Sequence, residues 1–301
     1  MSAQIIDGKR VSQEIRTQIT QRVERLKQHG ITPGLAVVLV GDNPASHSYV
    51  RGKEKACADV GIRSFDRRLA ADVSQAELLS VIEQFRDDNN VDGILVQLPL
   101  PPHIDEERVN DAIGYRKDVD GFHPENLGRM LIGRPNFLPC TPYGVMKLLE
   151  TIGVDPSGKE VVIVGRSNIV GKPLSAMLIQ KAAGANATVT VCHTGTRNLA
   201  SHTQRAEILI AAAGKAACIT AEMIRPGAVV IDVGVNRVDD ASTKNGYRLV
   251  GDVDFVPAAE KASWITPVPG GVGPMTITML LNNTVESAER RARAAEAKPN
   301  G

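Results

Sequence analysis

The apolar positions in the first part of the chain alternate between a helical period and continuous runs. Five apolar residues spaced three or four positions apart predict an amphipathic helix, and they are Val11, Ile15, Ile19, Val23 and Leu26. Gly30 ends this helix, and residues 35–40 then form an apolar run without a polar break. Such a run is typical of a strand that is buried on both faces of a parallel sheet.

The same order of helix and strand repeats along the chain. We expect a helix over about 46–60, a short strand over 63–69, a helix marked by Leu78, Leu79, Ile82 and Phe85, and a buried strand over 93–98. A second series begins at 159–165, and its further strands are predicted at 188–192, 208–212 and 229–233. Strands and helices alternating at this pitch predict doubly wound parallel sheets.

Three segments interrupt this rhythm. Residues 115–142 are rich in Gly, Pro and Asp and are expected to be a domain junction. Residues 237–252 contain Asp239-Asp240 and Asn245-Gly246, which favour a hairpin or an exposed loop. The chain then ends in one long helix from Met275 to about Ala297, in which we expect residues 289–293 to form a solvated face.

The predicted fold is therefore α/β, with two doubly wound parallel-sheet lobes and an active-site cleft between them. Residues 1–139 together with 277–301 are expected to form one domain, and residues 140–276 the second, Rossmann-like domain. A length of 301 residues fits this division, because single domains are commonly shorter.

The composition excludes several classes of protein. A net charge of +1 and an aromatic content of 3% argue against a nucleic-acid binder, which needs a basic surface and stacking rings. The four cysteines lie far apart without a CxxC pair, so we expect neither a disulfide framework nor a metal site. No apolar run approaches eighteen residues and the first ten residues carry no apolar leader, so we expect a cytoplasmic protein without a membrane partner.

The start of the second series resembles a nucleotide-binding turn. A strand that ends at Gly165 runs into residues 166–173, where a helix begins, and such a junction directs backbone N–H groups at an anion. The glycines at 165 and 171 do not have the GxGxxG spacing, so an ordinary strand-to-helix turn explains them equally well.

The end of the next strand, at 188–192, is more informative. It is followed by Thr194 and Arg197 rather than by the acidic residue that holds the ribose of NAD, which favours NADP.

Polar residues in the first half fall where α/β sheets bind ligands. Tyr49 and Lys53 lie four residues apart, on one face of the helix that follows the first buried strand. Gln97 lies at the carboxyl end of another strand, and Asp118 and Asp120 follow the next helix. One sheet edge could thus gather a phenol, an amine, a carboxamide and a carboxylate. Each of these residues also has a purely structural interpretation, as an exposed helix face or a turn.

Five long motifs resolve this choice, because they occur in order over nearly the whole chain and together resemble one family. They are Gly-Asp-Asn-Pro-Ala-Ser-x-Ser-Tyr-Val-x-x-Lys (41–53), Asp-Gly-Ile-Leu-Val-Gln-Leu-Pro-Leu-Pro (92–101), Lys-Asp-Val-Asp-Gly-Phe (117–122), Gly-Arg-Ser-x-Ile-Val-Gly-x-Pro (165–173) and Pro-Gly-Gly-Val-Gly-Pro-Met-Thr (269–276). The chain resembles the bifunctional methylenetetrahydrofolate dehydrogenase/methenyltetrahydrofolate cyclohydrolase family.

The resemblance implies two reactions in one site. NADP⁺ takes a hydride from 5,10-methylenetetrahydrofolate, and water then opens the methenyl cation to 10-formyltetrahydrofolate. By motif position, Lys53 is the general acid/base, Gln97 its hydrogen-bonding partner, Tyr49 the ring that packs on the folate, and Asp120 the anchor for the pterin. The first domain is then the catalytic, folate-binding one.

The resemblance also assigns the cofactor site and the setting of the enzyme. Gly165, Arg166, Ser167 and Thr194 hold NADP, Val235 contacts it, and the loop with Gly270 and Gly271 lines the substrate site. Thr194 departs from the family pattern, in which Ser is common, although the hydroxyl is kept. The family further implies a homodimer in one-carbon metabolism, linked to purine biosynthesis.

Two other classes of protein share part of this pattern. Short-chain-type dehydrogenases also use a Tyr-x-x-x-Lys pair, but there the pair follows an N-terminal glycine-rich fingerprint. Here Tyr49 and Lys53 precede the nucleotide loop by more than a hundred residues, so the order argues against that class. A non-catalytic folate- or nucleotide-binding module is the other alternative, and only an assay separates it from an enzyme.

Overall fold

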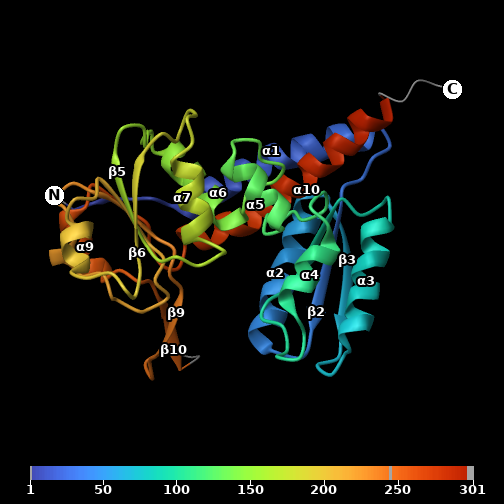
Figure 1. The fold of residues 1–301 in the computed structure, drawn as a ribbon, viewed down its shortest axis with the longest axis horizontal. Coiled ribbons are helices and arrows are strands. Elements are labelled where there is room, and N and C mark those ends of the chain that lie inside the picture. Colours follow the sequence, from blue (N-terminus) through green and yellow to red (C-terminus); the bar gives the residue numbers. More distant parts are fainter. Residues whose placement is uncertain (1, 244–245, 297–301) are drawn as a thin grey trace. The chain divides into compact units, whose positions relative to one another are not determined.

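The computed structural model describes residues 2–243 and 246–296, and the chain divides into two compact units (Figure 1). One unit comprises Met1–Gln13 and Thr141–Thr276, and the other comprises Glu14–Cys140 and Ile277–Gly301. We call them the six-stranded unit and the three-stranded unit, after their main sheets.

The three-stranded unit is built on a parallel sheet with the order β3-β2-β4. The strands are β2 (Gly34–Val40), β3 (Arg63–Leu69) and β4 (Gly93–Val96). The chain steps from β2 to one neighbour, β3, and then crosses back to the other, β4. A parallel bridge between Ile94 and Asp118 extends the sheet beyond β4. Successive connections that run in opposite directions create a switch point beside β2, where α/β sheets bind ligands.

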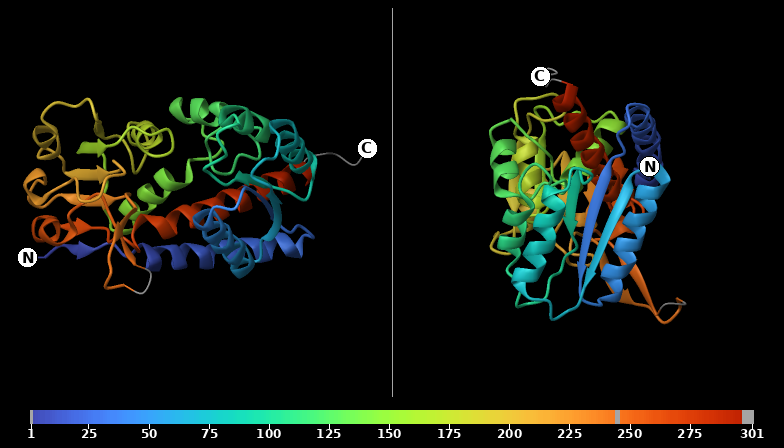
Figure 2. Two further views of the ribbon diagram at one scale, coloured as in Figure 1. Left: turned by 90° about the horizontal axis from the view of Figure 1, so that it is seen from below. Right: turned by 90° about the vertical axis from the view of Figure 1, so that its right-hand side faces the viewer.

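Helices cover both faces of this sheet, as the right-hand view of Figure 2 shows. The helices of the unit are α1 (Gly8–Gln28), α2 (Pro44–Val60), α3 (Gln75–Asp87), α4 (Glu106–Ile113), α5 (Pro124–Leu131) and α10 (Val272–Glu296), of which α1 and α10 each cross the division between the units. Every residue of β2 is buried, which is why this strand has no polar position. Ala36, Val38 and Val40 pack into one core with residues of α3 and α4, and the alternate residues of β2 face the other way.

The six-stranded unit contains a parallel sheet with the order β1-β11-β8-β7-β5-β6. Its strands are β1 (Gln4–Ile5), β5 (Glu160–Val164), β6 (Thr188–Cys192), β7 (Ile208–Ala211), β8 (Val229–Asp232) and β11 (Trp264–Ile265). The chain passes from β5 to β6 and then back across β5 to β7. The switch point of this doubly wound sheet therefore lies between β5 and β7, next to the loop that begins at Gly165.

Short helices and one hairpin complete the six-stranded unit. The helices are α6 (Cys140–Thr151), whose first residue belongs to the other unit, α7 (Gly171–Leu178), α8 (Leu199–Thr203), the 3₁₀ turn η1 (Ala221–Met223) and α9 (Phe255–Lys261). Strands β9 (Asn236–Asp239) and β10 (Tyr247–Val250) pair antiparallel and form the hairpin seen in Figure 1. The predicted hairpin over 237–252 is thus present, and residue 245 of its expected turn lies outside the described residues, as does residue 297 at the end of the predicted long helix.

The structure differs from the sequence predictions at the N-terminus. Residues before α1 were expected in the same domain as β2, but β1 pairs with β11 in the six-stranded sheet. The backbone N–H of Ile6 also donates to the carbonyl of Ile265 at 2.9 Å. A two-residue strand has too short a hydrophobic pattern to reveal its partner, so only the tertiary structure could place it.

Two other segments are more ordered than predicted. The expected junction at 115–142 contains helix α5 and the start of α6. The expected solvated face at 289–293 is wrong for Arg290 and Arg291. Arg291 forms a two-pronged ion pair with Asp92, whose side chain is only 2% exposed, and Arg290 pairs with Glu286. A run of charged residues on a helix predicts a solvent-exposed face, because the sequence does not show a buried partner from a distant segment.

Candidate active site

Lys53 and Gln97 meet in the three-stranded unit. Lys53 lies on α2, which follows β2, and Gln97 comes directly after β4, where its backbone N–H donates to Val38 at 2.8 Å. The Nζ of Lys53 donates to Oε1 of Gln97 at 2.9 Å, and the Nε2 of Gln97 donates to the Leu98 carbonyl at 2.7 Å. The second bond fixes which amide atom faces the amine. The amine therefore has a neutral acceptor at the carboxyl edge of the sheet.

Burial weakens the preference of Lys53 for its charged form. Loss of water around the side chain lowers the pKa of this lysine, and the negative charge of Asp120 opposes the shift in part. Gln97 contributes no charge, so it does not hold the amine as an ammonium ion as a carboxylate would. A lowered pKa makes the neutral amine, which can accept a proton, easier to form.

Asp120 is the acidic partner of this site. Burial raises the pKa of its carboxyl, the Lys53 charge acts in the opposite direction, and the nearby Asp118 raises the pKa further. The buried thiol of Cys140 also lies close enough to interact, and burial and the Asp120 charge raise the pKa of this thiol. Lys53 and Asp120 thus oppose each other's shift, which is the pattern expected of an electrostatically coupled pair.

Asp118, the other acid of the same motif, has a structural role. Its carboxylate is buried and accepts hydrogen bonds from the N–H groups of Gly121 and His123 at 3.1 and 2.7 Å. It also accepts one from Nδ2 of Asn126 at 2.8 Å. These bonds hold the turn that carries Asp120. The sequence offered both acids, and the number of backbone partners distinguishes them.

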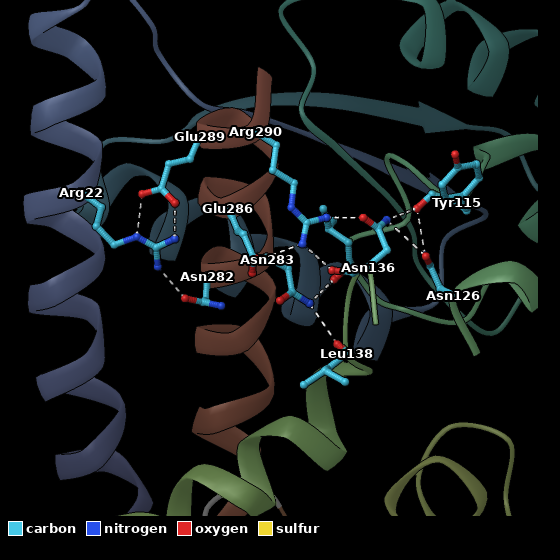
Figure 3. A network of polar contacts seen from close by, with 11 residues as sticks. Arg22, Tyr115, Asn126, Asn136, Leu138, Asn282, Asn283, Glu286, Glu289 and Arg290 are labelled. Atoms are coloured by element: carbon cyan, nitrogen blue, oxygen red, sulfur yellow. Dashed lines mark hydrogen bonds and ion pairs between the residues drawn. The ribbon is translucent and has the colours of Figure 1, made fainter. Parts of the chain in front are cut away.

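Asn283 on α10 is a supporting residue that the sequence reasoning missed. Its Nδ2 group is buried and donates to the carbonyls of Val119 at 2.8 Å and Leu138 at 3.0 Å. Figure 3 shows Asn283 pointing from α10 toward Leu138. These carbonyls flank Asp120 and Cys140 in the sequence, so one amide fixes both segments. An asparagine in an apolar helical stretch was the available signal, because a buried amide needs partners.

The polar network of Figure 3 holds α10 in place within the three-stranded unit. On one side Arg22 of α1 donates to both carboxylate oxygens of Glu289, at 2.9 and 2.8 Å, and to Asn282 at 2.7 Å. On the other side Arg290 donates to the side chain and the backbone carbonyl of Asn136. Because α10 carries Asn283, these contacts also support the segments beside Asp120.

Tyr49 lies one helical turn before Lys53 on α2, as the spacing predicted. Its side chain is 55% exposed, which is high for a ring of this size. An exposed tyrosine next to a buried amine offers a flat apolar face at the edge of the site, suited to packing on a planar ring.

The loop after β5 in the six-stranded unit requires glycine. Gly165 has a φ of 137°, and a Cβ built on it would lie 2.0 Å from the carbonyl oxygen of Ala212. A Cβ on Gly171 would lie 2.0 Å from the Gly165 carbonyl. Both glycines therefore allow close backbone contacts at the switch point between β5 and β7. The turn leads into the first residues of α7, and the backbone N–H groups at a helix start are suited to binding a phosphate.

The other predicted cofactor residues lie in the same unit. Arg166, Ser167 and Thr194 are exposed, and Val235 is 51% exposed, which is unusual for valine. Ser167 accepts a hydrogen bond from the N–H of Val170 at 3.1 Å and so caps the turn before α7. The turn after β6 is closed by Thr196, whose hydroxyl accepts from the N–H of His193 at 2.9 Å.

Gly270 and Gly271 belong to the six-stranded unit as well. Gly270 has a φ of 111°, and the backbone at Gly271 leaves no room for a side chain beside Thr266. Gly8, at the start of α1, approaches so closely that its Cβ would lie 1.8 Å from the Gly271 carbonyl oxygen. The loop is thus held by backbone packing, and its assignment to the substrate site stays a prediction.

The described residues contain neither a metal-binding cluster nor a membrane-spanning helix. Within 2–243 and 246–296, no group of three or more His, Cys, Asp or Glu residues is arranged to hold a metal ion. Across the same residues, no helix has the length and apolar character needed to cross a membrane.

Comparison with known proteins identifies the family. Residues 6–120 match the catalytic domain of tetrahydrofolate dehydrogenase/cyclohydrolase, and residues 139–292 match the NAD(P)-binding domain of the same family. The bifunctional protein FolD of Moorella thermoacetica is 59% identical over 290 residues, which are 96% of this chain and 100% of that protein. FolD of Bacillus subtilis is 57% identical over 96% of this chain and 99% of its own length.

Solved structures agree over the same length. The FolD methylenetetrahydrofolate dehydrogenase/cyclohydrolase of Campylobacter jejuni has a TM-score of 0.91 and 48% identity, covering 96% of this chain and 100% of that one. The enzyme of Trypanosoma brucei, solved with NADP cofactor and an inhibitor, has a TM-score of 0.92 and 41% identity, covering 97% and 99%. Both family domains occur here in order and nearly complete, so the chain belongs to the tetrahydrofolate dehydrogenase/cyclohydrolase family.

Proposed function

We propose that this chain oxidises 5,10-methylenetetrahydrofolate to 5,10-methenyltetrahydrofolate with NADP⁺ and then hydrolyses the product to 10-formyltetrahydrofolate. It is a bifunctional enzyme, both a dehydrogenase and a cyclohydrolase. The observation that carries the assignment of the chemistry is the hydrogen bond between Lys53 and Gln97, with Asp120 coupled to the same amine. The remaining roles follow from what each reaction requires.

The oxidation makes small demands on acid–base groups. Hydride leaves a carbon that lies between two nitrogens, and the resulting positive charge is shared by both, so no base has to remove a proton from that carbon. NADP⁺, when bound, accepts the hydride. The protein must chiefly hold the two ring systems in a reactive orientation. Tyr49 suits this task, because its exposed ring can pack on the folate.

The hydrolysis does need a group that accepts and returns a proton. The amine of Lys53 in its neutral form takes a proton from water as the oxygen bonds to the methenyl carbon. The ammonium then gives this proton to the ring nitrogen whose bond to that carbon breaks. The new hydroxyl releases its own proton to solvent as it becomes a carbonyl, which leaves a formyl group on the other nitrogen. The lowered pKa of Lys53 makes its neutral, proton-accepting form easier to reach than that of an exposed lysine. Gln97 orients the amine without adding charge.

Asp120 is assigned to the pterin. Burial raises the pKa of this carboxyl, and the positive charge of Lys53 favours its ionised form. The ionised carboxylate accepts hydrogen bonds, and the pterin ring offers donors for them. Asp118 and Asn283 hold the segment that carries Asp120. Asp120 is therefore the specificity group of the site, and Lys53 the proton-transfer group.

The six-stranded unit is assigned to NADP. The close-packed turn at Gly165 and Gly171 fits a phosphate at the start of α7. Arg166, Ser167 and Thr194 supply a cation and hydroxyls, Val235 is an exposed apolar contact, and no acidic residue follows β6 between 193 and 197. These residue types suit a 2′-phosphate better than a free ribose hydroxyl.

Steady-state assays of both steps on the purified protein test this function. With NADP⁺ and methylenetetrahydrofolate, absorbance of the reduced nicotinamide should rise. With methenyltetrahydrofolate alone, its absorbance should fall faster than in buffer. Binding of both ligands without either change would identify a non-catalytic module and overturn the proposal.

We further propose that the enzyme acts in the cytoplasm as a homodimer, in the one-carbon metabolism that supplies purine biosynthesis. This rests on the family alone. Light scattering of the purified protein tests the dimer, since a monomer mass at working concentration would contradict it. Fractionation of the source cells tests the compartment. A purine requirement after loss of the gene, relieved by purines in the medium, would support the metabolic role.

A further inference from the structure

Two buried aspartates lie at the edge of the six-stranded unit, outside the site described above. Asp232 is the last residue of β8, and Asp252 comes shortly after β10. Asp232 is 3% exposed and Asp252 is fully buried. Burying two carboxylates without a basic partner is costly, so hydrogen-bond donors must offset the loss of water.

Asp252 is satisfied by four donors from two segments. Its Oδ2 accepts from the backbone N–H groups of Ala213 and Gly214 at 2.6 and 2.9 Å. Its Oδ1 accepts from the N–H of Lys215 at 3.0 Å and from Nδ2 of Asn236 at 2.8 Å. Three successive amides that converge on one anion form the kind of backbone concavity that binds anions. Here the protein fills it with its own carboxylate.

Asp232 in turn fixes the backbone around Asp252. It accepts from the N–H groups of Asp252 and Val253 at 3.0 and 2.9 Å, and from that of Gly234 at 3.0 Å. Two glycines make room for this arrangement. A Cβ on Gly234 would lie 2.1 Å from the Asp252 carboxylate, and one on Gly251 would lie 1.8 Å from the Asp232 carboxylate. The two acids therefore interlock, each packed against a glycine next to the other.

The two segments held by Asp252 adjoin the predicted cofactor site. Residues 213–215 follow Ala212, whose carbonyl oxygen lies against Gly165 of the nucleotide turn. Asn236 directly follows Val235, the exposed valine predicted to contact the cofactor. One buried carboxylate thus fixes both the loop after β7 and the start of β9.

We propose that Asp252 is a positioning residue for NADP⁺ binding, which acts by holding residues 213–215 and Asn236 in place beside the Gly165 turn. The inference rests on the assignment of this unit to NADP. Asp252 is fully buried and so does not contact the cofactor itself. Loosening its contacts would let the loop and Val235 move, and a misplaced loop binds the cofactor less tightly without changing the groups of the three-stranded unit.

The test compares two substitutions of neighbouring acids. In Asp252→Asn, one oxygen that accepts from backbone amides becomes an NH₂ group that cannot accept. In the control, Asp254→Asn, the altered side chain is exposed and makes no capping bond at the start of α9. We expect calorimetric titration to give a Kd for NADP⁺ about 10- to 100-fold higher in the first variant, corresponding to the loss of one hydrogen bond to a charged group. The control should bind like the parent.

Cyclohydrolase activity measured without NADP⁺ reports whether the chain is folded. We expect Asp252→Asn to keep the parental rate of methenyltetrahydrofolate hydrolysis, and hydrogen exchange at amides 213–215 to accelerate.

Asn236→Ala removes one donor to Asp252 and leaves the backbone bonds, so it should weaken NADP⁺ binding by a smaller factor. This variant replaces the first one if Asp252→Asn does not fold. A folded Asp252→Asn protein with the parental Kd, or equal loss of hydrolysis and NADP⁺ affinity, overturns the inference. Absence of NADP⁺ binding by the parent protein would instead contradict the proposed function.

Discussion

The notable groups of the two units are of different kinds. In the three-stranded unit, the important groups are side chains with shifted pKa values, above all Lys53 and Asp120. In the six-stranded unit, the close contacts are made by backbone, at Gly165 and at the amides of residues 213–215. Proton transfer needs a group whose charge can change, whereas a phosphate needs fixed donors. The comparison teaches that the two activities can be impaired separately.

The largest expected effect is a loss of hydrolysis from a substitution in the three-stranded unit alone. Lys53→Met keeps most of the apolar stem but removes the amine, so hydrolysis of methenyltetrahydrofolate should fall by about 10²- to 10⁴-fold. NADP⁺ affinity should be unchanged, and dehydrogenase activity should fall less than hydrolysis. Lys55→Met, an exposed lysine on the same helix, is the matched control for the assay. Hydrolysis near the parental rate would mean that Lys53 is only a helix-face residue, and Asp120 would then be the first candidate for activating water.

A smaller effect is expected from the partner of the amine. Gln97→Ala leaves Lys53 in place but removes its acceptor, so hydrolysis should fall by about tenfold or more, less than in Lys53→Met. The pH profile of the remaining activity distinguishes positioning from proton transfer, because the lysine still titrates. A loss as large as that of Lys53→Met would assign the proton transfer to both residues acting as a unit.

The next prediction concerns the six-stranded unit alone. Arg166→Ala should raise the KM for NADP⁺ by about tenfold while the KM for NAD⁺ changes little, because only NADP⁺ carries the 2′-phosphate. Arg225→Ala removes an exposed arginine just before β8 and should change neither value. An equal increase for both cofactors would show that Arg166 serves the pyrophosphate, and Thr194 or Arg197 would then have to read the 2′-phosphate.

Substitution of Asp232 is expected to have the smallest effect on activity. Its effect on the pH dependence of stability should be measurable. Burial raises the pKa of this carboxyl to about 6, above its ordinary value of 3.8, and the nearby Asp252 contributes in the same direction. The folded state therefore binds the proton more tightly than the unfolded state. The contribution of Asp232 to stability is fully present below pH 3.8 and is lost as the pH rises through 6, by at most about 3 kcal/mol.

The Asp232→Asn variant carries no titrating group at this position. The difference in unfolding free energy between the parent and this variant therefore gives the pH-dependent contribution of Asp232. Urea unfolding of both proteins between pH 4 and 7.5 should show the stability of the parent, relative to the variant, decreasing as the pH rises. A difference that stays constant over this range would mean that Asp232 is not protonated near pH 6.

Much of this protein was determined by its sequence. Apolar runs at 35–40 and 161–164 predicted buried parallel strands, and both are central strands of their sheets. The position of Gln97 at a strand end and of Lys53 on the helix after β2 predicted their meeting, because parallel strands bring their carboxyl ends to one edge. Periodicity and topology rules act over short distances in the chain, so the sequence alone reveals them.

The tertiary structure decided what depends on distant partners. It separated Asp120, which is coupled to Lys53, from the buried and backbone-bonded Asp118. It placed β1 in the six-stranded sheet and gave Arg291 a buried acidic partner. It also gave the buried side chains of Asn283 and Asp252 the backbone groups to which they hydrogen-bond. Arg291 lies 199 residues from Asp92, and Asn283 lies 164 residues from Val119. The cost of burying such polar groups is offset only by partners that the fold brings to them.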